Sequence, residues 1–341
     1  MTLIETIPEP TLMRESVLIE ADRVRILDRR IFPLEKQFVD CPDVESVAQA
    51  IEAMVTQSMG PFLAATAAMV LAAREAQDLA PTGRCEAMQV AAKRLRDTRP
   101  TNNAIRDGMA ALLDQMPALA ENAAFGAATE EAVRRLWADR RARSASLGDA
   151  AASLVRDGDT ILTHCWGETS IIAMLESCLR SGKRVSVICT ETRPYLQGSR
   201  LTAHSVAEMG IPTTVITDGM AAHAMASGMV SRFMTAADRV TLSGHVFNKV
   251  GTFQIAIAAR ALGVPFVAMV QEPDRLAPGP EDVRNEMRDG EEVLNCLGQR
   301  TGTPLAKGWY PAFDVTPPEY VSAVATSRGV FSSFALEQVF A

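Results

Sequence analysis

The sequence predicts an α/β protein, with a mainly helical N-terminal domain that carries a small β segment and a Rossmann-like parallel-sheet domain after it. The chain has 341 residues, and at about 150 residues per domain this length suggests two domains. Roughly the first 145 residues are rich in alanine, arginine, glutamate and leucine, whereas later residues form apolar runs that alternate with helical segments. We therefore expect domains at 1–147 and 148–341.

The N-terminal domain is expected to begin with β structure and to continue as helices. Apolar and charged residues alternate with period two within 4–39, which predicts a small sheet or hairpin. Asp43 can cap the helix that follows. The apolar face of that helix consists of Val44, Val47, Ala48, Ile51, Met54 and Val55. Further amphipathic helices are expected within 64–143, broken near Pro100, Pro117 and Gly126.

Five apolar runs are the expected strands of the C-terminal sheet: 160–163, 184–189, 213–216, 232–235 and 265–270. The helices expected between them are 168–181, 203–209, 221–228 and 252–262, and they supply the crossovers of a parallel sheet. Neither the glycine fingerprint of dinucleotide-binding sheets nor the P-loop pattern follows any of these strands. This argues against a nicotinamide-dependent oxidoreductase on the same class of sheet.

Composition excludes several classes of partner. The formal net charge of -7 argues against a general nucleic-acid or anionic-membrane surface. The six cysteines form no C-x-x-C pair, and the four histidines show no ligand spacing, so we expect neither disulfides nor a metal site. The longest apolar stretch, 61–73, is too short to cross a bilayer. No export signal is visible at the start, so we expect a cytoplasmic protein.

Polar residues follow all five expected strands, at the sheet edge where open α/β proteins bind their ligands. They are His164-Cys165, Glu191-Thr192-Arg193, Asp218, Asp238-Arg239 and Gln271-Glu272. We expect them to form one functional rim, and the alternative is that they only satisfy amides at the strand ends.

Cys165 stands between a strand and a helix that begins near Glu168. The field of the helix N-terminus would ease ionisation of its thiol, whereas a small buried cysteine is the ordinary alternative. His164 precedes it on the strand, so its side chain should point to the opposite face.

The segment 236–252 contains Asp238 together with two further polar residues, Asn248 and Lys249. Lys249 beside a helix start at Gly251-Thr252 would seat a phosphate. Asp238 is either the cap of a turn or a carboxylate that transfers protons near an anionic substrate.

Eight sequence blocks together resemble one known family. They are ILDRRIFPLE (26–35), TRPT (98–101), ILTHC (161–165), ETRPYLQGSRLTA (191–203), GIPTTVITDGMAAHAM (210–225), AADRV (236–240), NKVGT (248–252) and YPAFDVTPPE (310–319). The chain is similar to methylthioribose-1-phosphate isomerase, which is related to ribose-1,5-bisphosphate isomerase and to the regulatory subunits of the initiation-factor exchange complex.

The resemblance implies an aldose–ketose isomerase that converts a pentose 1-phosphate, 5-methylthioribose 1-phosphate in methionine salvage, to the ketose. Cys165 and Asp238 would carry the proton chemistry. The phosphorylated sugar would be held by Arg99, Gln197, Asn248 and Lys249, with Arg193 as an organiser. The resemblance also implies a homodimer, and the reaction needs neither cofactor nor metal.

Two departures from the family pattern bear on the substrate. Gln57, Ser58 and Met59, which the resemblance places among the substrate-binding residues, stand where methylthioribose members carry Arg-Gly-Ala, so one phosphate-binding guanidinium is missing. The loop after the cysteine is shortened to Trp166–Thr169, and Trp166 either walls the C5 substituent of the sugar or belongs to the core. The alternatives are therefore an isomerase of ribose 1,5-bisphosphate or of 5-deoxyribose 1-phosphate, or a non-catalytic sensor of a sugar phosphate or nucleotide.

Overall fold

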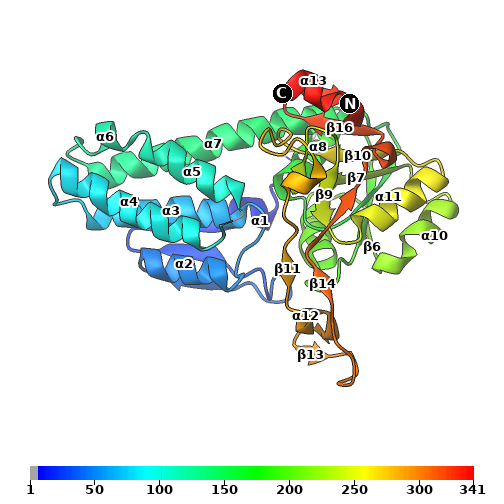
Figure 1. Cartoon of the computed structure of the whole chain (residues 1–341), viewed down its shortest axis with the longest axis horizontal. Helices are drawn as coiled ribbons and strands as arrows, with labels where there is room; N and C mark the ends of the chain where they lie inside the picture. Colours follow the sequence, from blue (N-terminus) through cyan, green and yellow to red (C-terminus); the bar gives the residue numbers. More distant parts are fainter. Residues whose placement is uncertain (1–6, 101) are drawn as a thin grey trace. The chain divides into compact units, whose positions relative to one another are not determined.

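The computed structural model describes residues 7–100 and 102–341. Two parts of the expectations therefore lie outside the described residues: the start of the predicted β segment, 4–6, and Thr101 of the TRPT block. The chain forms two compact units. One is Thr11–Ala142, and the other contains Arg143–Ala341 and the described residues before Thr11 (Figure 1). The division into domains at residue 147 stays a prediction.

The first unit opens with the expected β segment, a three-stranded antiparallel sheet in the order β1-β2-β3. After the short helix α1 (Thr11–Arg14), its strands are β1 (Val17–Ile19), β2 (Val24–Leu27) and β3 (Phe38–Cys41). The helix α2 (Val44–Glu52) follows. Asp43 caps α2 as predicted, because its side chain accepts a hydrogen bond of 2.8 Å from the Ser46 backbone N–H.

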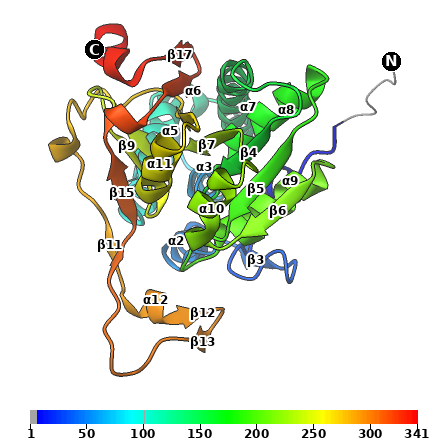
Figure 2. The ribbon, with the colours of Figure 1, turned by 90° about the vertical axis from the view of Figure 1, so that its right-hand side faces the viewer.

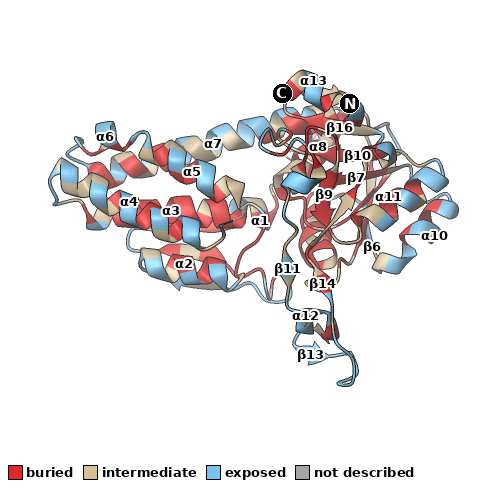
Figure 3. Cartoon of the chain, viewed as in Figure 1, coloured by how far each residue is buried: buried red, intermediate tan, exposed pale blue. Residues whose placement is uncertain are grey.

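Five further helices begin in this unit: α3 (Gly60–Glu75), α4 (Pro81–Asp97), α5 (Asn103–Leu113), α6 (Met116–Leu119) and α7 (Phe125–Ala152). The alanine-rich α3 is the buried centre, drawn mostly red in Figure 3. Small residues allow its neighbours to approach closely: a Cβ on Gly108 of α5 would lie 2.7 Å from the Phe62 ring. Trp137 of α7 donates its indole N–H to the Thr66 hydroxyl of α3, at 2.8 Å.

The second unit is built on a seven-stranded sheet in the order β17-β16-β10-β7-β4-β5-β6 (Figure 2). Six strands are parallel: β4 (Thr160–Thr163), β5 (Ser186–Thr190), β6 (Thr213–Ile216), β7 (Arg232–Ala236), β10 (Phe266–Met269) and β16 (Ala323–Thr326). The edge strand β17 (Gly329–Phe331) is antiparallel to β16. The five strands predicted from the sequence are neighbours in one parallel sheet, and the predicted fold class is confirmed.

Helices follow these strands as predicted: α8 (Glu168–Arg180), α9 (Ala203–Glu208) after the π-helical turn η1 (Gly198–Thr202), α10 (Ala221–Ala226) and α11 (Thr252–Ala261). Leu162, Phe233 and Phe266 pack with α10 and α11 in one buried cluster. Their neighbours Ile161 and Met234, whose side chains point to the other face, are buried too. Both faces of the sheet are therefore covered, which is typical of a parallel sheet.

The C-terminal part adds strands that the sequence did not predict. A three-stranded antiparallel sheet joins β8 (Arg239–Val240), β9 (Val246–Lys249) and β15 (Phe313–Thr316). An arm, residues 283–312, leaves the second unit (Figure 2). It consists of β11 (Met287–Arg288), α12 (Glu291–Leu294), β12 (Asn295–Cys296), β13 (Gln299–Arg300) and β14 (Tyr310–Pro311).

The remaining elements are short. They are the 3-10 turns η2 (Asp218–Met220), η3 (Pro280–Asp282), η4 (Pro318–Tyr320) and η5 (Ser333–Ala335), and the last helix α13 (Leu336–Phe340). Among the described residues, no helix combines the length and the apolar character needed to span a membrane.

Candidate active site

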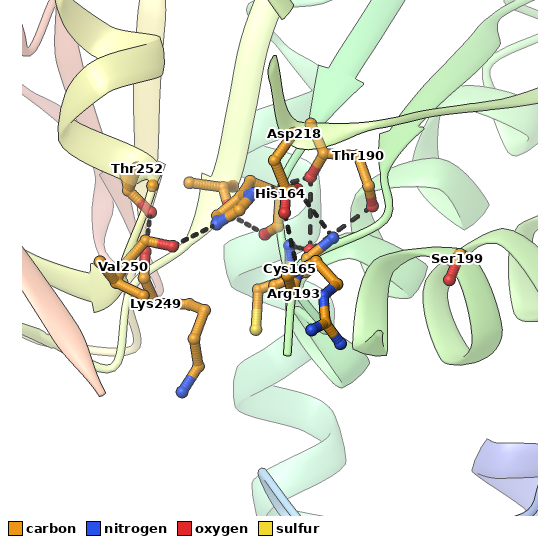
Figure 4. A network of polar contacts seen from close by, with 12 residues as sticks. His164, Cys165, Thr190, Arg193, Ser199, Asp218, Lys249, Val250 and Thr252 are labelled. Atoms are coloured by element: carbon orange, nitrogen blue, oxygen red, sulfur yellow. Dashed lines mark hydrogen bonds and ion pairs between the residues drawn. The ribbon is translucent and has the colours of Figure 1, made fainter. Parts of the chain in front are cut away.

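The centre of the candidate site is the turn between β4 and α8, where Cys165 follows the strand (Figure 4). The Cys165 backbone N–H donates to the Thr192 hydroxyl at 2.9 Å, and the Thr202 hydroxyl donates to the Cys165 carbonyl at 2.5 Å. Cys165 and Thr192 have φ angles of 69° and 62°, in the left-handed region. Residues other than glycine rarely adopt this backbone conformation. The hydrogen bonds to the Cys165 backbone therefore hold it in this conformation, and with it the position of the thiol.

His164 is fully buried beside the thiol and forms two hydrogen bonds. Its Nε2 lies 3.1 Å from the Val250 carbonyl, which can only accept, so Nε2 carries the hydrogen. Its Nδ1 lies 2.6 Å from the Thr190 hydroxyl, which therefore donates to it. Burial lowers the pKa of His164, so the imidazole is neutral. His164 thus ties β4 to the strand β5 and to the turn after β9.

Asp218 organises the loop that follows β5. Its two carboxylate oxygens accept hydrogen bonds of 2.8 Å from the backbone N–H groups of Thr192 and Arg193. The Arg193 guanidinium in turn donates to the Pro194 carbonyl at 3.0 Å and to the Val293 carbonyl in the arm at 2.9 Å. Arg193 therefore connects the loop beside the thiol to the arm.

The electrostatic environment of the Cys165 thiol corrects the first expectation about it. Burial raises the pKa of Cys165 to about 11. Lys249 and the Trp166 backbone N–H lower this pKa, whereas the carboxylates of Asp238 and Asp218 raise it. The prediction that the helix N-terminus makes the thiol ionise more easily was wrong, because loss of hydration outweighs the favourable field. The thiol is neutral at physiological pH.

The charged groups that affect the pKa of Cys165 come from distant parts of the chain. Asp238 is exposed in the turn between β7 and β8, and Lys249 ends β9, yet the charges of both act on the thiol of Cys165. In Figure 4 the sulfur of Cys165, the Lys249 ammonium and the Arg193 guanidinium point to the same side. Two residues of the predicted rim, Cys165 and Asp238, thus come together here, and the charges of Asp238 and Lys249 both reach the thiol.

Lys249 is the cation of this group. Its side chain is buried, and its Nζ lies 4.9 Å from the centre of the Phe313 ring and 5.7 Å from that of Tyr310. Across 7–100 and 102–341, no carboxylate forms an ion pair with it. A buried ammonium held by aromatic faces and lacking a paired carboxylate favours an anionic ligand.

The N-terminus of α11 corrects a second expectation. The backbone N–H groups of Gly251 and Phe253 donate to Oδ2 of Asp314, at 2.7 Å and 3.0 Å. A carboxylate of the chain itself therefore occupies the position at which we expected the helix to receive a phosphate. Lys249 remains the candidate phosphate ligand in this segment, without the helix N-terminus.

Asn248 and Gln197, the two other predicted sugar ligands of this unit, are buried. The Asn248 amide nitrogen donates to the Thr252 hydroxyl at 3.0 Å. Gln197 directly precedes the π-helical turn η1. Their contacts with a sugar stay a prediction.

The other predicted ligands lie in the first unit. Gln57, Ser58 and Met59 form the turn before α3, in which Ser58 has a φ of 55°. The Arg29 guanidinium, fully buried, donates to the Gln57 carbonyl at 2.7 Å and so holds this turn. Arg99 follows α4. A contribution of these side chains to sugar binding stays a prediction.

Sequence reasoning missed two residues that build this site: Thr190 and Asp314. Thr190 was overlooked because we considered charged groups and the thiol, although it directly follows a predicted strand. Asp314 belongs to the YPAFDVTPPE block, and only the pairing of β15 with β9 brings it to the helix N-terminus.

Fold and site together define a class: a Rossmann-like α/β protein with an anion-binding candidate site at the carboxyl edge of its parallel sheet. Comparison with known proteins identifies the family. The model of the initiation factor 2 subunit family matches residues 55–333. The chain belongs to this family.

Some of its relatives and structural neighbours are named as isomerases, and others are named as initiation factor subunits. The methylthioribose-1-phosphate isomerase of Thermotoga neapolitana is 34% identical over 90% of this chain and 92% of its own, and that of Thioalkalivibrio sulfidiphilus is 34% identical over 92% of each. The 5-methylthioribose 1-phosphate isomerase structure from Pyrococcus horikoshii has a TM-score of 0.85 at 27% identity, covering 99% and 98% of the two chains. A translation initiation factor eIF-2B delta subunit from A. fulgidus has a TM-score of 0.81 at 30% identity, covering 93% and 95%.

Proposed function

We propose that this protein is an aldose–ketose isomerase that converts a pentose 1-phosphate, foremost 5-methylthioribose 1-phosphate, to the ketose 1-phosphate. One observation carries the proposal: the neutral Cys165 thiol lies within the electrostatic reach of the Asp238 carboxylate and the buried Lys249 ammonium. A proton donor and acceptor pair beside an anion-binding cation is what this reaction requires. The relatives named as isomerases support the same conclusion.

The substrate determines what the side chains must do. The phosphate on C1 prevents the ring from opening by loss of the anomeric substituent, so the bond between C1 and the ring oxygen must break with protonation of that oxygen. A hydrogen then moves from C2 to C1, which oxidises C2 to a ketone and reduces C1. We assign Asp238, in its protonated form, to proton delivery at the ring oxygen, and the proton that the C2 hydroxyl releases as the ketone forms restores it. We assign Cys165 to proton removal at C2 or to transition-state support.

The raised pKa of Cys165 has a consequence for this mechanism. A neutral thiol is not a base, so proton removal requires the thiol to ionise inside the site. Lys249 and the Trp166 backbone N–H are the two groups that favour the thiolate. Their proximity supports a thiolate that forms during turnover and then accepts the proton strongly, as a base of high pKa does.

Turnover of a panel of pentose 1-phosphates that differ only at C5 tests the proposal. We expect conversion of 5-methylthioribose 1-phosphate, and a loss of roughly 10²- to 10⁴-fold in kcat for Cys165→Ala and Asp238→Asn. Cys85→Ala, in the first unit, is the matched control and should keep the wild-type rate. A strong preference for ribose 1,5-bisphosphate would overturn the first-choice substrate, and conversion of no member would overturn the isomerase itself.

The second candidate is a non-catalytic sensor of a sugar phosphate or nucleotide. The likeness to the initiation factor subunit of A. fulgidus favours it, at 30% identity. Measurable binding of a pentose 1-phosphate without formation of the ketose would support the sensor. The homodimeric state and the cytoplasmic location stay predictions.

A further inference from the structure

Trp166 directly follows Cys165, one of the two residues assigned to proton transfer. Its backbone N–H is close enough to the Cys165 sulfur to lower the pKa of the thiol. The next residue, Gly167, lies against Ala236 at the end of β7, because a Cβ on Gly167 would stand 3.2 Å from the Ala236 Cβ. Asp238 comes two residues after Ala236. The Trp166-Gly167 turn therefore connects the thiol with the turn that carries the carboxylate.

The indole of Trp166 has an unmet hydrogen-bonding requirement. The side chain is 5% exposed, and its Nε1 is buried without a hydrogen-bond partner in the described part of the chain. Buried indole N–H groups almost always have a partner, because the donor loses its water on burial. A bound ligand can supply the acceptor that the described residues do not provide.

The other two tryptophans of the chain show the contrast. The Trp137 indole N–H has its partner within the protein, the Thr66 hydroxyl. Trp309 is 75% exposed, so water can satisfy its indole. Among the tryptophans, all of which the structure describes, only Trp166 combines burial with an unpartnered donor.

We propose that Trp166 is a substrate-binding residue whose indole N–H donates a hydrogen bond to an oxygen of the sugar phosphate. An indole N–H can donate but cannot accept, so its partner must offer a lone pair. The hydroxyl and phosphate oxygens of a pentose 1-phosphate supply such lone pairs. The inference rests on the proposed function, and it adds a specific contact between the substrate and the shortened loop after Cys165.

Indole resonances test this contact directly. A chain labelled with ¹⁵N-tryptophan should show three indole N–H signals, and Trp166→Phe assigns one by removing it. The ligand is 5-methylthioribose 1-phosphate, which is left to equilibrate with its ketose. Phosphorus-31 nuclear magnetic resonance follows the conversion in the same sample. We expect the Trp166 signal to move downfield on ligand addition and the Trp137 signal to stay.

Kinetics and melting separate a binding role from a structural one. Trp166→Phe keeps the aromatic ring and removes the donor, so we expect KM to rise about 2- to 12-fold with kcat nearly unchanged. Its melting temperature should not fall, because the free enzyme loses no hydrogen bond. Trp137→Phe is the matched control: it removes a satisfied donor, so it should lower the melting temperature and leave KM unchanged.

Two results would overturn the inference while leaving the proposed function intact. One is a Trp166 signal that does not move although the sugar is converted, which would assign the donor to an internal water. The other is a Trp166→Phe enzyme with the wild-type KM. If no pentose 1-phosphate of the panel is converted, the proposed function fails and this inference fails with it.

Discussion

Gly251 lies against the imidazole of His164: a Cβ at position 251 would stand 3.0 Å from both Cε1 and Nε2 of the ring. The same glycine has a φ of 110°, and its N–H donates to Asp314. The turn after β9 is thus pressed onto the histidine that ties β4 to β5. Any side chain at position 251 must push the two apart.

Gly251→Ala should therefore destabilise the protein by about 2–4 kcal/mol, since the backbone strain of a positive φ adds to the displacement of His164. Urea unfolding measures this free energy. Gly263→Ala is the control, because Gly263 has a φ of 71° but nothing within 4 Å of an added Cβ. It should cost only about 1–2 kcal/mol. Equal losses for the two variants would show that the contact with His164 contributes nothing.

The thiol of Cys165 should react slowly at neutral pH. With a pKa of about 11, roughly one thiol in a thousand is ionised at pH 8. Alkylation by iodoacetamide, followed on the Cys165 peptide by mass spectrometry, should accelerate about tenfold per pH unit between pH 8 and 10. A rate that levels off below pH 9 would contradict the raised pKa.

The same thiol should make stability fall at alkaline pH. Its folded pKa of about 11 exceeds the ordinary 9.0, so the unfolded chain loses the proton first. Its contribution is fully present below pH 9 and is lost as the pH rises toward 11. Cys165→Ser should reduce this decline, and the remaining decline comes from other buried thiols such as Cys189, whose pKa is also raised. If the unfolding free energies of wild type and Cys165→Ser fell in parallel between pH 9 and 11, the predicted contribution of the Cys165 thiol would be wrong.

Asp314 should also make the stability of the protein fall as the pH rises, but in the acidic range. Burial raises the pKa of its carboxyl from 3.8 to about 6, although two backbone N–H groups lower it. The folded state therefore binds this proton more tightly, and the contribution of Asp314 to stability falls as the pH rises from about 4 to 6. For this partly buried group, we expect a loss of about 1–3 kcal/mol.

Asp314→Asn removes that titration, and its amide oxygen can still accept from Gly251 and Phe253. Relative to wild type, the variant should gain stability between pH 4 and pH 7, as measured by urea unfolding at both pH values. Asp314→Ala is the control that removes the acceptor as well, and it should be less stable than Asp314→Asn at both pH values. If the wild type instead gained stability relative to Asp314→Asn as the pH rises, the prediction of a raised pKa for Asp314 would be wrong.

Lys249 should bind the phosphate of the substrate. Lys249→Met should raise KM about 10- to 150-fold, the value of one charge-assisted hydrogen bond. Its melting temperature should not fall, because a buried ammonium without a paired carboxylate carries a desolvation cost in the free protein. Lys93→Met removes an exposed lysine and should leave KM unchanged. A Lys249→Met enzyme with the wild-type KM would exclude this phosphate ligand.

Much of the fold could be predicted because local patterns determine it. The runs at 160–163 and 213–216 became β4 and β6 without any change of boundary, because both are short runs rich in β-branched residues. Asp43 caps α2 as expected. The strands β9 and β15 were missed because their antiparallel pairing joins segments more than sixty residues apart. Such pairings leave little local signal.

By itself, the amino-acid sequence determined the order of strands and helices, the fold class and the edge of the sheet at which polar groups gather. Periodicity and composition are local properties, so they can be found along a single chain. Tertiary structure alone decided that the Cys165 thiol is neutral and that Asp314, instead of a ligand, caps α11. A pKa depends on the water excluded and the charges brought close by distant segments, and no pattern of neighbouring residues contains that information.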